Sequence, residues 1–276
     1  MIRSKRERPV ALAVLIVMAA GTVFPIAWLV LTGFKPASSI VSPTPELFFE
    51  PVFDNYAKIL SGGLNSPIVV AIVNSIFVAV VSTFFAMVLS AMAAYGLARL
   101  RPRGHRFLSI LVLGFKVLPP IAMIVPLFLI SSRLHIVDTQ IALILPYLAL
   151  SIPFATWLLF GFFQDLPSEL EEAALIDGST WFGAFVRVVL PLAAPGLAAT
   201  AVFSFSLAWN DLALALALTR DSAFTLPVLA SQVRTEEGIQ WGMLGATATI
   251  MIIPMLIFTI FASKHLVSGL SSGAVK

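Results

Sequence analysis

The side chains best suited to chemistry in this chain are five carboxylates gathered in one short stretch, residues 164–190. A single basic residue, Arg187, accompanies them there, and long apolar runs flank the stretch on both sides. Carboxylates gathered in this way bind a partner by charge, or they only keep an exposed loop solvated. The five are Asp165, Glu169, Glu171, Glu172 and Asp177.

The residues around these acids predict a short helix that ends abruptly. Pro167 suits a first helical turn, and the acids beside it favour the positive N-terminal end of a helix. Leu170, Ala173 and Ala174 recur at helical spacing, and the two alanines make that face shallow enough for close approach to another backbone. Gly178 should end the helix, because glycine readily adopts the left-handed conformation found just past helix ends.

A second helix is expected directly after this glycine. Thr180 is a good N-cap, and Pro191 should break the helix before the next apolar run. The order of helix, glycine, helix and Leu190-Pro191 describes a small rigid projection on a glycine joint. Its second helix is amphipathic, and the apolar side is expected to hold Phe182, Phe185, Val186 and Val189.

Sequence motifs for catalysis or nucleotide binding are missing. There is no Gly-x-x-x-x-Gly-Lys-Ser/Thr phosphate loop and no Gly-x-Gly-x-x-Gly. His105, His135 and His265 lie far apart, which argues against a metal site. Gly269–Gly273 matches Gly-x-Ser-x-Gly, but a serine hydrolase needs an acid and a histidine downstream, and the chain has almost no residues left there. We therefore expect a non-catalytic chain that binds no metal or cofactor itself.

Composition places these features in a membrane protein. Hydrophobic residues make up 59% of the 276 residues and charged residues only 11%, with a mean hydropathy of +1.00. A soluble domain carries about a quarter charged residues. The net charge of +3 forms no continuous basic patch, so nucleic-acid binding is not expected. The lack of cysteine rules out disulfides and thiolate metal sites.

Six apolar runs are long enough to cross a bilayer as helices, which takes about 20 residues each. The first follows a cluster of basic residues and is too long for a cleaved signal peptide, so we expect an uncleaved signal anchor. We find no internal repeat and expect one transmembrane domain over residues 1–276. The six expected spans are 9–34, 67–98, 107–132, 139–164, 188–219 and 241–263.

The distribution of Lys and Arg orients these spans. With the N-terminus in the cytoplasm, eleven of the 17 basic residues lie in inner segments and five in outer ones. This asymmetry follows the positive-inside rule. Because the number of spans is even, both termini are expected on the cytoplasmic side. The acidic stretch 164–190 is then a cytoplasmic loop, while 35–66 and 220–240 are external.

Two places inside the expected spans carry polar side chains, which rarely face lipid. Asn210 and Asp211 interrupt the fifth run near its external end, where Asp211 either lines a path or braces a neighbouring helix. Lys116 lies closer to the cytoplasm in the third run, at a different depth from Asp211, so a salt bridge between them is not expected. It precedes Pro119-Pro120, which must break that span.

The acidic stretch resembles the cytoplasmic coupling motif of ATP-binding-cassette importer permeases. That motif reads Glu-Ala-Ala, three residues, Gly, and about a dozen residues later Ile-x-Leu-Pro. Here Glu172-Ala173-Ala174, Gly178 and Val188–Pro191 match it. The resemblance implies an ATPase that lies on another chain. It assigns the coupling role to Glu171, Glu172, Ala173, Ala174, Asp177, Gly178, Leu190 and Pro191.

Other segments are similar to the second permease subunit of carbohydrate-type importers, the maltose-type branch of this family. They are Asn74-Ser75, 93–99, 144–147, Trp209-Asn210-Asp211, 225–228, Trp241-Gly242 and 269–276. The likeness covers nearly the whole chain, although Asp211 stands where many relatives have Glu. It implies an all-α, polytopic fold of six transmembrane helices, the type I (MetI-like) importer permease fold.

The resemblance also implies partners and a mechanism. The chain would form a heterodimer with a second permease subunit in the cytoplasmic (inner) membrane. Two ATP-binding subunits would hydrolyse ATP with Mg, and an external solute-binding protein would deliver a sugar, polyol or related solute. Candidates for the translocation path are Asn74, Lys116, Tyr147, Trp209, Asn210 and Asp211. The alternative is an ion-gradient-driven secondary transporter, which would need paired intramembrane charges and an inverted repeat.

Overall fold

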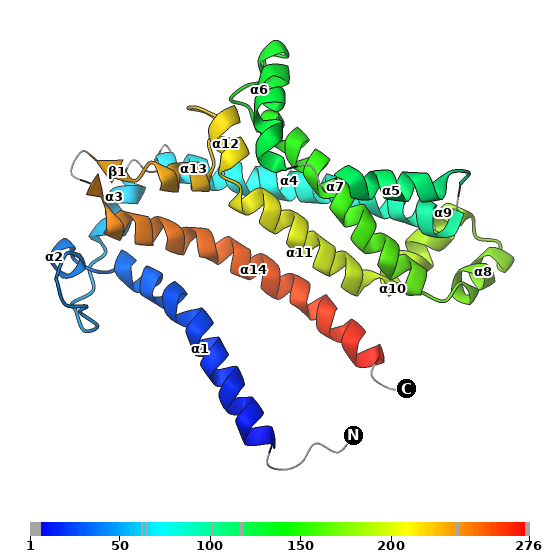
Figure 1. The fold of residues 1–276 in the computed structure, drawn as a ribbon, viewed down its shortest axis with the longest axis horizontal. Coiled ribbons are helices and arrows are strands. Elements are labelled where there is room, and N and C mark those ends of the chain that lie inside the picture. Colours follow the sequence, from blue (N-terminus) through cyan, green and yellow to red (C-terminus); the bar gives the residue numbers. More distant parts are fainter. Residues whose placement is uncertain are drawn as a thin grey trace. The chain divides into compact units, whose positions relative to one another are not determined.

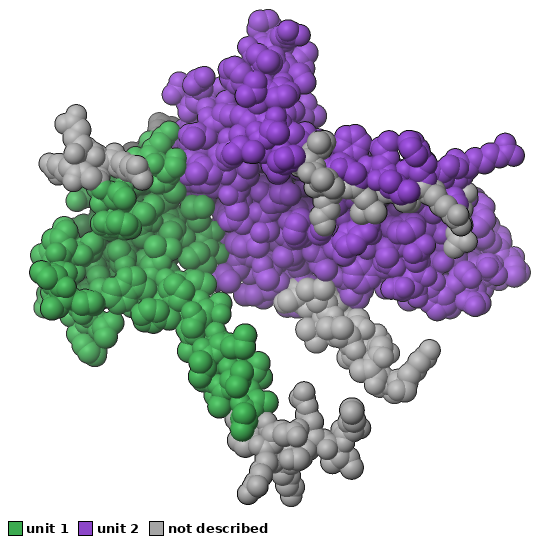
Figure 2. All heavy atoms as spheres, in the orientation of Figure 1, with its two compact units in different colours: residues 1–69, 229–253 green, residues 70–228, 254–276 purple. Residues whose placement is uncertain are grey.

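The computed structural model describes residues 7–61, 63, 66–100, 102–115, 119–235 and 238–273. Helices dominate this part of the chain, and its one sheet is a hairpin with two residues in each strand (Figure 1). The chain forms two compact units, residues 1–69 with 229–253 and residues 70–228 with 254–276 (Figure 2). The expected all-α fold is confirmed, with this hairpin as its small exception.

Unit 1 contains α1 (Glu7–Gly33) and the first part of α14 (Trp241–Gly273), whose backbones touch. A Cβ atom at Gly33 would lie 2.9 Å from the Ala246 nitrogen, and one at Gly245 would lie 2.6 Å from the Gly33 nitrogen. Only glycine permits this approach. The amide of Asn55 adds two bonds, to the Gly33 carbonyl at 3.0 Å and to the Lys35 carbonyl at 3.2 Å. The other elements here are α2 (Ala37–Ile40), α3 (Asp54–Leu60), β1 (Arg234–Thr235) and β2 (Gly238–Ile239).

Unit 2 is a helical bundle in which α7 (Gln140–Asp165) packs against both α11 (Ala194–Asn210) and α5 (His105–Phe115) (Figure 1). Thr139 caps α7, since its hydroxyl oxygen accepts the Ala142 N–H. Other helices of this unit include α4 (Pro67–Tyr95), the π-helical η2 (Gly96–Leu100), the 3₁₀-helical η3 (Pro120–Met123), α6 (Ile124–Arg133) and α12 (Ala213–Leu218), whereas α13 (Leu226–Ser231) is divided between the two units.

Four of the six expected spans appear, within the described residues, as single helices long and apolar enough to cross a membrane. They are Val10–Gly33, Pro67–Leu100, Gln140–Asp165 and Trp241–Ala262. A fifth is present if the pair Trp181–Leu192 and Ala194–Asn210, bent by 79°, counts as one span. The remaining expected span, 107–132, is divided between α5 and α6, and residues 116–118 lie outside the described part. The break expected at Pro119-Pro120 falls at this interruption, because η3 begins at Pro120.

The surface of α1 shows why these helices suit a bilayer. Its apolar side chains are exposed along most of the helix, including Val17, Met18 and Phe24. A helix that is apolar on all sides and uncovered by its own chain is typical of a membrane span. In water the same surface would be a large uncovered apolar patch.

The connection 219–225, between α12 and α13, is fastened by a carboxylate outside the spans. Asp138, in the turn before α7, accepts the backbone N–H groups of residues 220–223 at 2.8–3.2 Å. Its φ of 61° is a left-handed conformation that Asp adopts more readily than most residues. Burial raises the pKa of Asp138, but these four N–H groups lower it, and the net pKa lies below the ordinary 3.8.

Replacing Asp138 by Asn tests this contact, since Asn tolerates the same backbone conformation but carries no charge. We expect Asp138→Asn to lower stability by about 1–3 kcal/mol at pH 7, measured as a lower thermal unfolding midpoint in detergent. The folded-state pKa is depressed, so the carboxylate stabilises the protein above pH about 4 and loses this effect as the pH falls further. The difference between the variant and the native chain should therefore shrink below pH about 4. Asp221→Asn, at an exposed carboxylate in the same connection, is the control and should leave the midpoint unchanged.

Candidate functional site

The acidic loop forms the short helix expected from its sequence. The helix, α8 (Glu169–Ile176), begins two residues after Pro167 and carries three glutamates in its first turn. The N–H groups of Glu171 and Glu172 donate to the Ser168 carbonyl at 3.0 Å each. Negative charge in the first turn is favourable because the free N–H groups there carry partial positive charge.

The C-terminal end of α8 is fixed by Gly178, as expected. Gly178 has a φ of 90°, a conformation that side chains with a Cβ rarely adopt. Its N–H donates to the Leu175 carbonyl at 3.0 Å, and the Ser179 N–H donates to the Ala174 carbonyl at 2.9 Å. This pair of bonds is the Schellman motif, which satisfies the last carbonyls of a helix and turns the chain away sharply.

The second helix of the loop also forms, and its expected apolar side chains are buried in part. The Thr180 hydroxyl accepts the Gly183 N–H at 3.1 Å, which confirms Thr180 as the N-cap. Phe185 and Val189 are buried, whereas Phe182 and Val186 are exposed. The rings of Phe182 and Phe185 lie with centroids 6.4 Å apart, so these two side chains share one side of the segment. The segment comprises α9 (Trp181–Ala184), the π-helical η4 (Phe185–Val189) and α10 (Leu190–Leu192).

The break between this segment and the next helix lies two residues later than expected. Pro191 lies in α10, which continues directly from η4, so the helical segment runs past this proline to Leu192. The chain turns at Ala193, and α11 leaves at 79° to the segment Trp181–Leu192. The expectation that Pro191 itself breaks the helix is therefore corrected.

Glu171, one of the five carboxylates, points into the protein. It is 3% exposed. The Tyr95 hydroxyl donates to one carboxylate oxygen, and the Arg99 Nε lies 3.1 Å from the other. Arg99 also donates to the Leu166 carbonyl at 2.7 Å. A buried carboxylate with a charged partner and a hydroxyl donor ties α8 to the end of α4 and to η2.

An aromatic and small-residue core surrounds this contact. The Tyr95 ring packs on Phe185 with centroids 4.6 Å apart and meets Phe163 edge-on at 6.5 Å. Alanines of α4 and η2 fill the space between them, including Ala94 and Ala98. The core joins α4, α7 and η4, so the buried Glu171 contact rests on three helices.

The other face of α8 is exposed. Glu169, Glu172 and Asp177 turn their carboxylates to the surface. Between them lie the exposed apolar side chains of Leu170 and Ile176. An acidic face with an apolar centre on a short, firmly anchored helix is suited to binding a protein partner. Ala173 is exposed on the same helix and leaves room for close approach.

Of the candidates for a translocation path, Asp211 caps a helix. One of its carboxylate oxygens accepts the N–H groups of Leu214 and Ala215 at 3.1 Å each. The buried Tyr147 hydroxyl donates to the same oxygen at 3.0 Å. These bonds cap α12 and tie it to α7. They correspond to the second role considered for Asp211, that of bracing a neighbouring helix.

Asn74 also holds backbone in place. Its amide donates to the carbonyls of Ser222 and Phe224 at 2.9 and 3.1 Å, and its oxygen accepts from Gln140 at 3.0 Å. The neighbouring Ser75 hydroxyl accepts the N–H of the first residue of α13 at 2.8 Å. Asn74 and Asp138 therefore both fasten the connection 219–225, Asn74 at its carbonyls and Asp138 at its N–H groups.

The remaining path candidates differ in exposure. Trp209 is buried, and its ring stacks on Phe205 with centroids 5.6 Å apart. Asn210 is exposed, and its amide donates to the carbonyl and hydroxyl of Ser206 at 2.9 and 3.1 Å. Lys116 lies outside the described residues. Among the described candidates, Asn210 is the one with an exposed side chain.

The sequence gives no chemical reason to select Tyr95 and Arg99, the two partners of Glu171. Both belong to the segment 93–99, whose signal is its resemblance to carbohydrate-type permeases. The signal in the sequence was an arginine and a tyrosine at the end of an apolar run. Their carboxylate partner lies about seventy residues away along the chain, so spacing gave no indication of the contact.

Residues 86–272, which include the loop and its anchor, match the family of binding-protein-dependent transport system inner membrane components. The chain belongs to this family. The permease is accordingly a multi-pass, helical membrane protein and a component of a binding-protein-dependent transport system. This match does not support the alternative of an ion-gradient-driven secondary transporter.

Known proteins resemble the permease along nearly its whole length. The trehalose transport system permease protein SugB of Mycobacterium tuberculosis is 39% identical over 269 residues, which is 96% of each chain. The trehalose/maltose transport system permease protein MalG of Thermococcus litoralis is 34% identical, over 95% of this chain and 94% of the relative. A solved bacterial ABC transporter involved in the import of the acidic polysaccharide alginate has a chain of the same fold. Its TM-score is 0.78 at 22% identity, over 96% of this chain and 98% of that one.

Adjacent glutamates in α8 provide a matched test of the buried contact. Glu171→Gln should lower the stability of the permease by roughly 3 kcal/mol, because it leaves the mostly buried Arg99 without its charge partner. Glu172→Gln, at the exposed neighbour, should stay within about 0.5 kcal/mol of the native protein. Thermal unfolding of both variants in the same detergent measures the difference. Equal midpoints for the two would contradict the assignment of Glu171 to the interior.

Proposed function

We propose that this permease carries a sugar or a related polyol across the inner membrane and is driven by ATPase subunits that dock on α8. The observation that carries the proposal is the geometry of the loop. A short helix with an exposed acidic and apolar face is anchored from behind by Glu171 and ends in a left-handed glycine. When a bound partner moves, a helix anchored in this way moves with it and passes the displacement to the rest of the permease, because the helix itself deforms little.

The anchoring determines where a displacement would go. A load on α8 would pass through Glu171 to Arg99 and Tyr95, and so to α4. A second route would run through Gly178 and the Thr180-capped segment to the 79° bend and α11. In this mechanism Glu172, Ala173, Ala174 and Asp177 contribute to docking. Leu190 and Pro191 belong to the segment that leads from the loop into the membrane.

The partners follow from the family and from the loop. A second permease subunit, two ATP-binding subunits and an external solute-binding protein would complete the importer. ATP and Mg would be used by the ATP-binding subunits, and this chain would bind no cofactor and catalyse no reaction. The position of the Gly-x-Ser-x-Gly match is consistent with this proposal. A catalytic serine in this motif lies on a strand-to-helix turn, whereas Gly269–Gly273 lies within α14.

The substrate class is inferred from the relatives. Two permeases with the identities given above are described as trehalose and trehalose/maltose transporters. The excess of basic residues at one side of the spans supports cytoplasmic termini and a cytoplasmic α8. Solute would then travel from the external binding protein toward the side on which the ATPases bind.

The experiment that tests this function is a pull-down of the permease from native membranes in mild detergent. An ATP-binding protein should co-elute, and its ATPase activity should rise when the complex is placed in vesicles with its binding protein and trehalose or maltose. An intact permease that brings down no ATP-binding protein would refute the coupling. Normal coupling without a response to any sugar or polyol would refute the substrate class alone.

A test of the glycine joint compares two substitutions at one position. No atom lies within 4 Å of a Cβ built on Gly178, so only its φ of 90° restricts the side chain. Gly178→Val should abolish transport while the protein stays in the membrane, because a β-branched residue strongly disfavours positive φ. Gly178→Asn should retain much of the activity, since Asn populates left-handed conformations. Solute uptake into vesicles, with membrane levels measured by immunoblot, decides between them.

Charge reversal tests the docking face separately. Glu172→Lys changes an exposed side chain, so the fold should remain intact. We expect it to weaken binding of the ATP-binding subunits roughly tenfold or more, by replacing an attraction with a repulsion. The amount of co-eluting ATPase measures this. The same reversal at the exposed Glu50, in the connection predicted to be external, is the control and should leave co-elution unchanged.

A further inference from the structure

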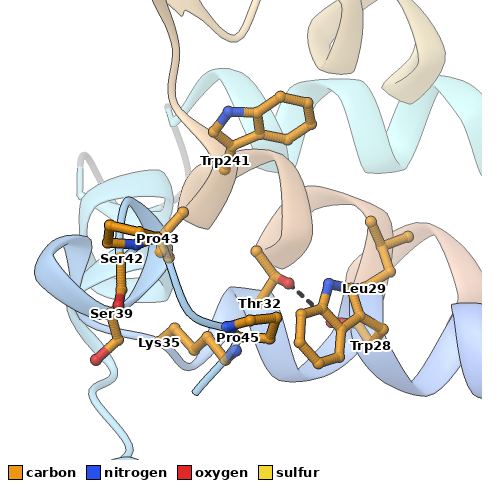
Figure 3. Close-up of a pocket in the computed structure, with 10 residues that line it drawn as sticks. Trp28, Leu29, Thr32, Lys35, Ser39, Ser42, Pro43, Pro45 and Trp241 are labelled. Atoms are coloured by element: carbon orange, nitrogen blue, oxygen red, sulfur yellow. Dashed lines mark hydrogen bonds between the residues drawn. The ribbon is translucent and has the colours of Figure 1, made fainter. Parts of the chain in front are cut away.

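A cavity of about 360 Å³ lies in unit 1 beside the C-terminal end of α1. Its lining side chains come from the end of α1, from the segment that follows it and from the start of α14 (Figure 3). Trp28, Leu29 and Trp241 give it apolar walls, and Lys35 and Ser39 give it polar groups. None of these residues belongs to the coupling loop.

Lys35 is the unusual member of this lining, because its side chain is only 4% exposed. Its ammonium group donates to the Glu46 carbonyl at 2.6 Å. It also lies 4.2 Å from the ring centroid of Trp28 and 5.2 Å from that of Phe49. Among the residues that the structure describes, no carboxylate forms an ion pair with it.

This environment leaves the charge of Lys35 incompletely compensated. A buried ammonium is stable when an anion and several acceptors surround it. The group has three N–H donors, and one carbonyl takes one of them. The ring faces attract the cation but accept no conventional hydrogen bond. The cavity wall thus presents a positive charge that an anion entering from outside would complete.

The surroundings favour an anion that carries apolar chains. The cavity adjoins α1, whose apolar side chains are exposed over most of the helix from Val10 to Ile26 and suit contact with lipid. The walls combine tryptophan rings with a lysine and serine hydroxyls, the residue types found where membrane spans meet headgroups. A free sugar would satisfy the rings and hydroxyls but not the charge.

We propose that this cavity binds the phosphate of a membrane phospholipid, with Lys35 as its counter-cation and the acyl chains lying along α1. The site rests on the membrane placement proposed above but not on the coupling to an ATPase. The lipid would join the end of α1 to the segment 36–46, because Lys35 holds Glu46 from the same ammonium group.

The test uses the full-length permease, purified in detergent with whatever subunits accompany it, delipidated and studied by native mass spectrometry with added lipid. Dioleoylphosphatidylglycerol is the probe, and dioleoylglycerol, with the same chains and no phosphate, is its matched control. We expect the phospholipid to bind and dioleoylglycerol to bind at least about tenfold more weakly. Equal binding of the two lipids would overturn the proposal. Binding of inorganic phosphate alone as tightly as the phospholipid would also overturn it.

Variants locate the site. Lys35→Met keeps most of the side-chain volume and should lose one tightly bound phospholipid, whereas Lys58→Met, at an exposed lysine of α3, should not. Should Lys35→Met fail to fold, Ser39→Phe keeps the lysine but fills the cavity and should lose the same lipid. Retention of the lipid in folded Lys35→Met or Ser39→Phe would overturn the proposal. Loss of lipid binding to the native permease when an acidic solute-binding protein occupies the cavity in its place would also overturn it. Co-elution of the ATPase is measured in parallel, and its loss would count against the coupling, not against the lipid site.

Discussion

The buried carboxylate of Glu171 is the contact on which the organisation of the cytoplasmic loop depends. Charge pairing with Arg99 and a hydrogen bond from Tyr95 hold it at the end of α4, and the rings of Tyr95 and Phe185 close the space around it. A charge removed from water is stable only with partners of this kind, so the contact fixes α8 in one position. Because one face of α8 is held in this way, the other is free to carry acidic and apolar side chains to a partner.

The polar residues of the helical bundle follow a similar principle. Asp211, Asn74 and Asp138 each bind backbone groups of a connection or a helix end, at places where the regular helical bonds stop. In a membrane an unpaired backbone group is costly, and side chains of this type satisfy it. Polar side chains in the described spans are therefore explained first by the ends and breaks of helices. Contact with solute requires an exposed polar group, and Asn210 is such a group.

Much of this arrangement was accessible from sequence because it depends on local rules. The composition and the apolar runs predicted a helical membrane protein, and the residues from Glu169 to Thr180 predicted a helix, a glycine stop and a second cap. The direction of Glu171 was not accessible, since its partners lie on another helix far away in the chain. The π-helical turn over Phe185–Val189 was not accessible either, because such a turn has no clear local signature in the sequence. The division of the third run was accessible, because Pro119-Pro120 was expected to break that span and η3 begins at Pro120.

The glycine contact between α1 and α14 has a further consequence for how this pair is held together. Lipid chains are as apolar as leucine side chains, so little solvent-driven attraction brings two membrane helices together. Their association depends on how many atoms come within van der Waals range, and that number is greatest where both surfaces are flat. At Gly33 and Gly245 the surfaces are as flat as a polypeptide allows. A single methyl group at either position would act as a spacer and force the two helices apart at this contact, although it adds apolar area that a soluble protein would use for cohesion.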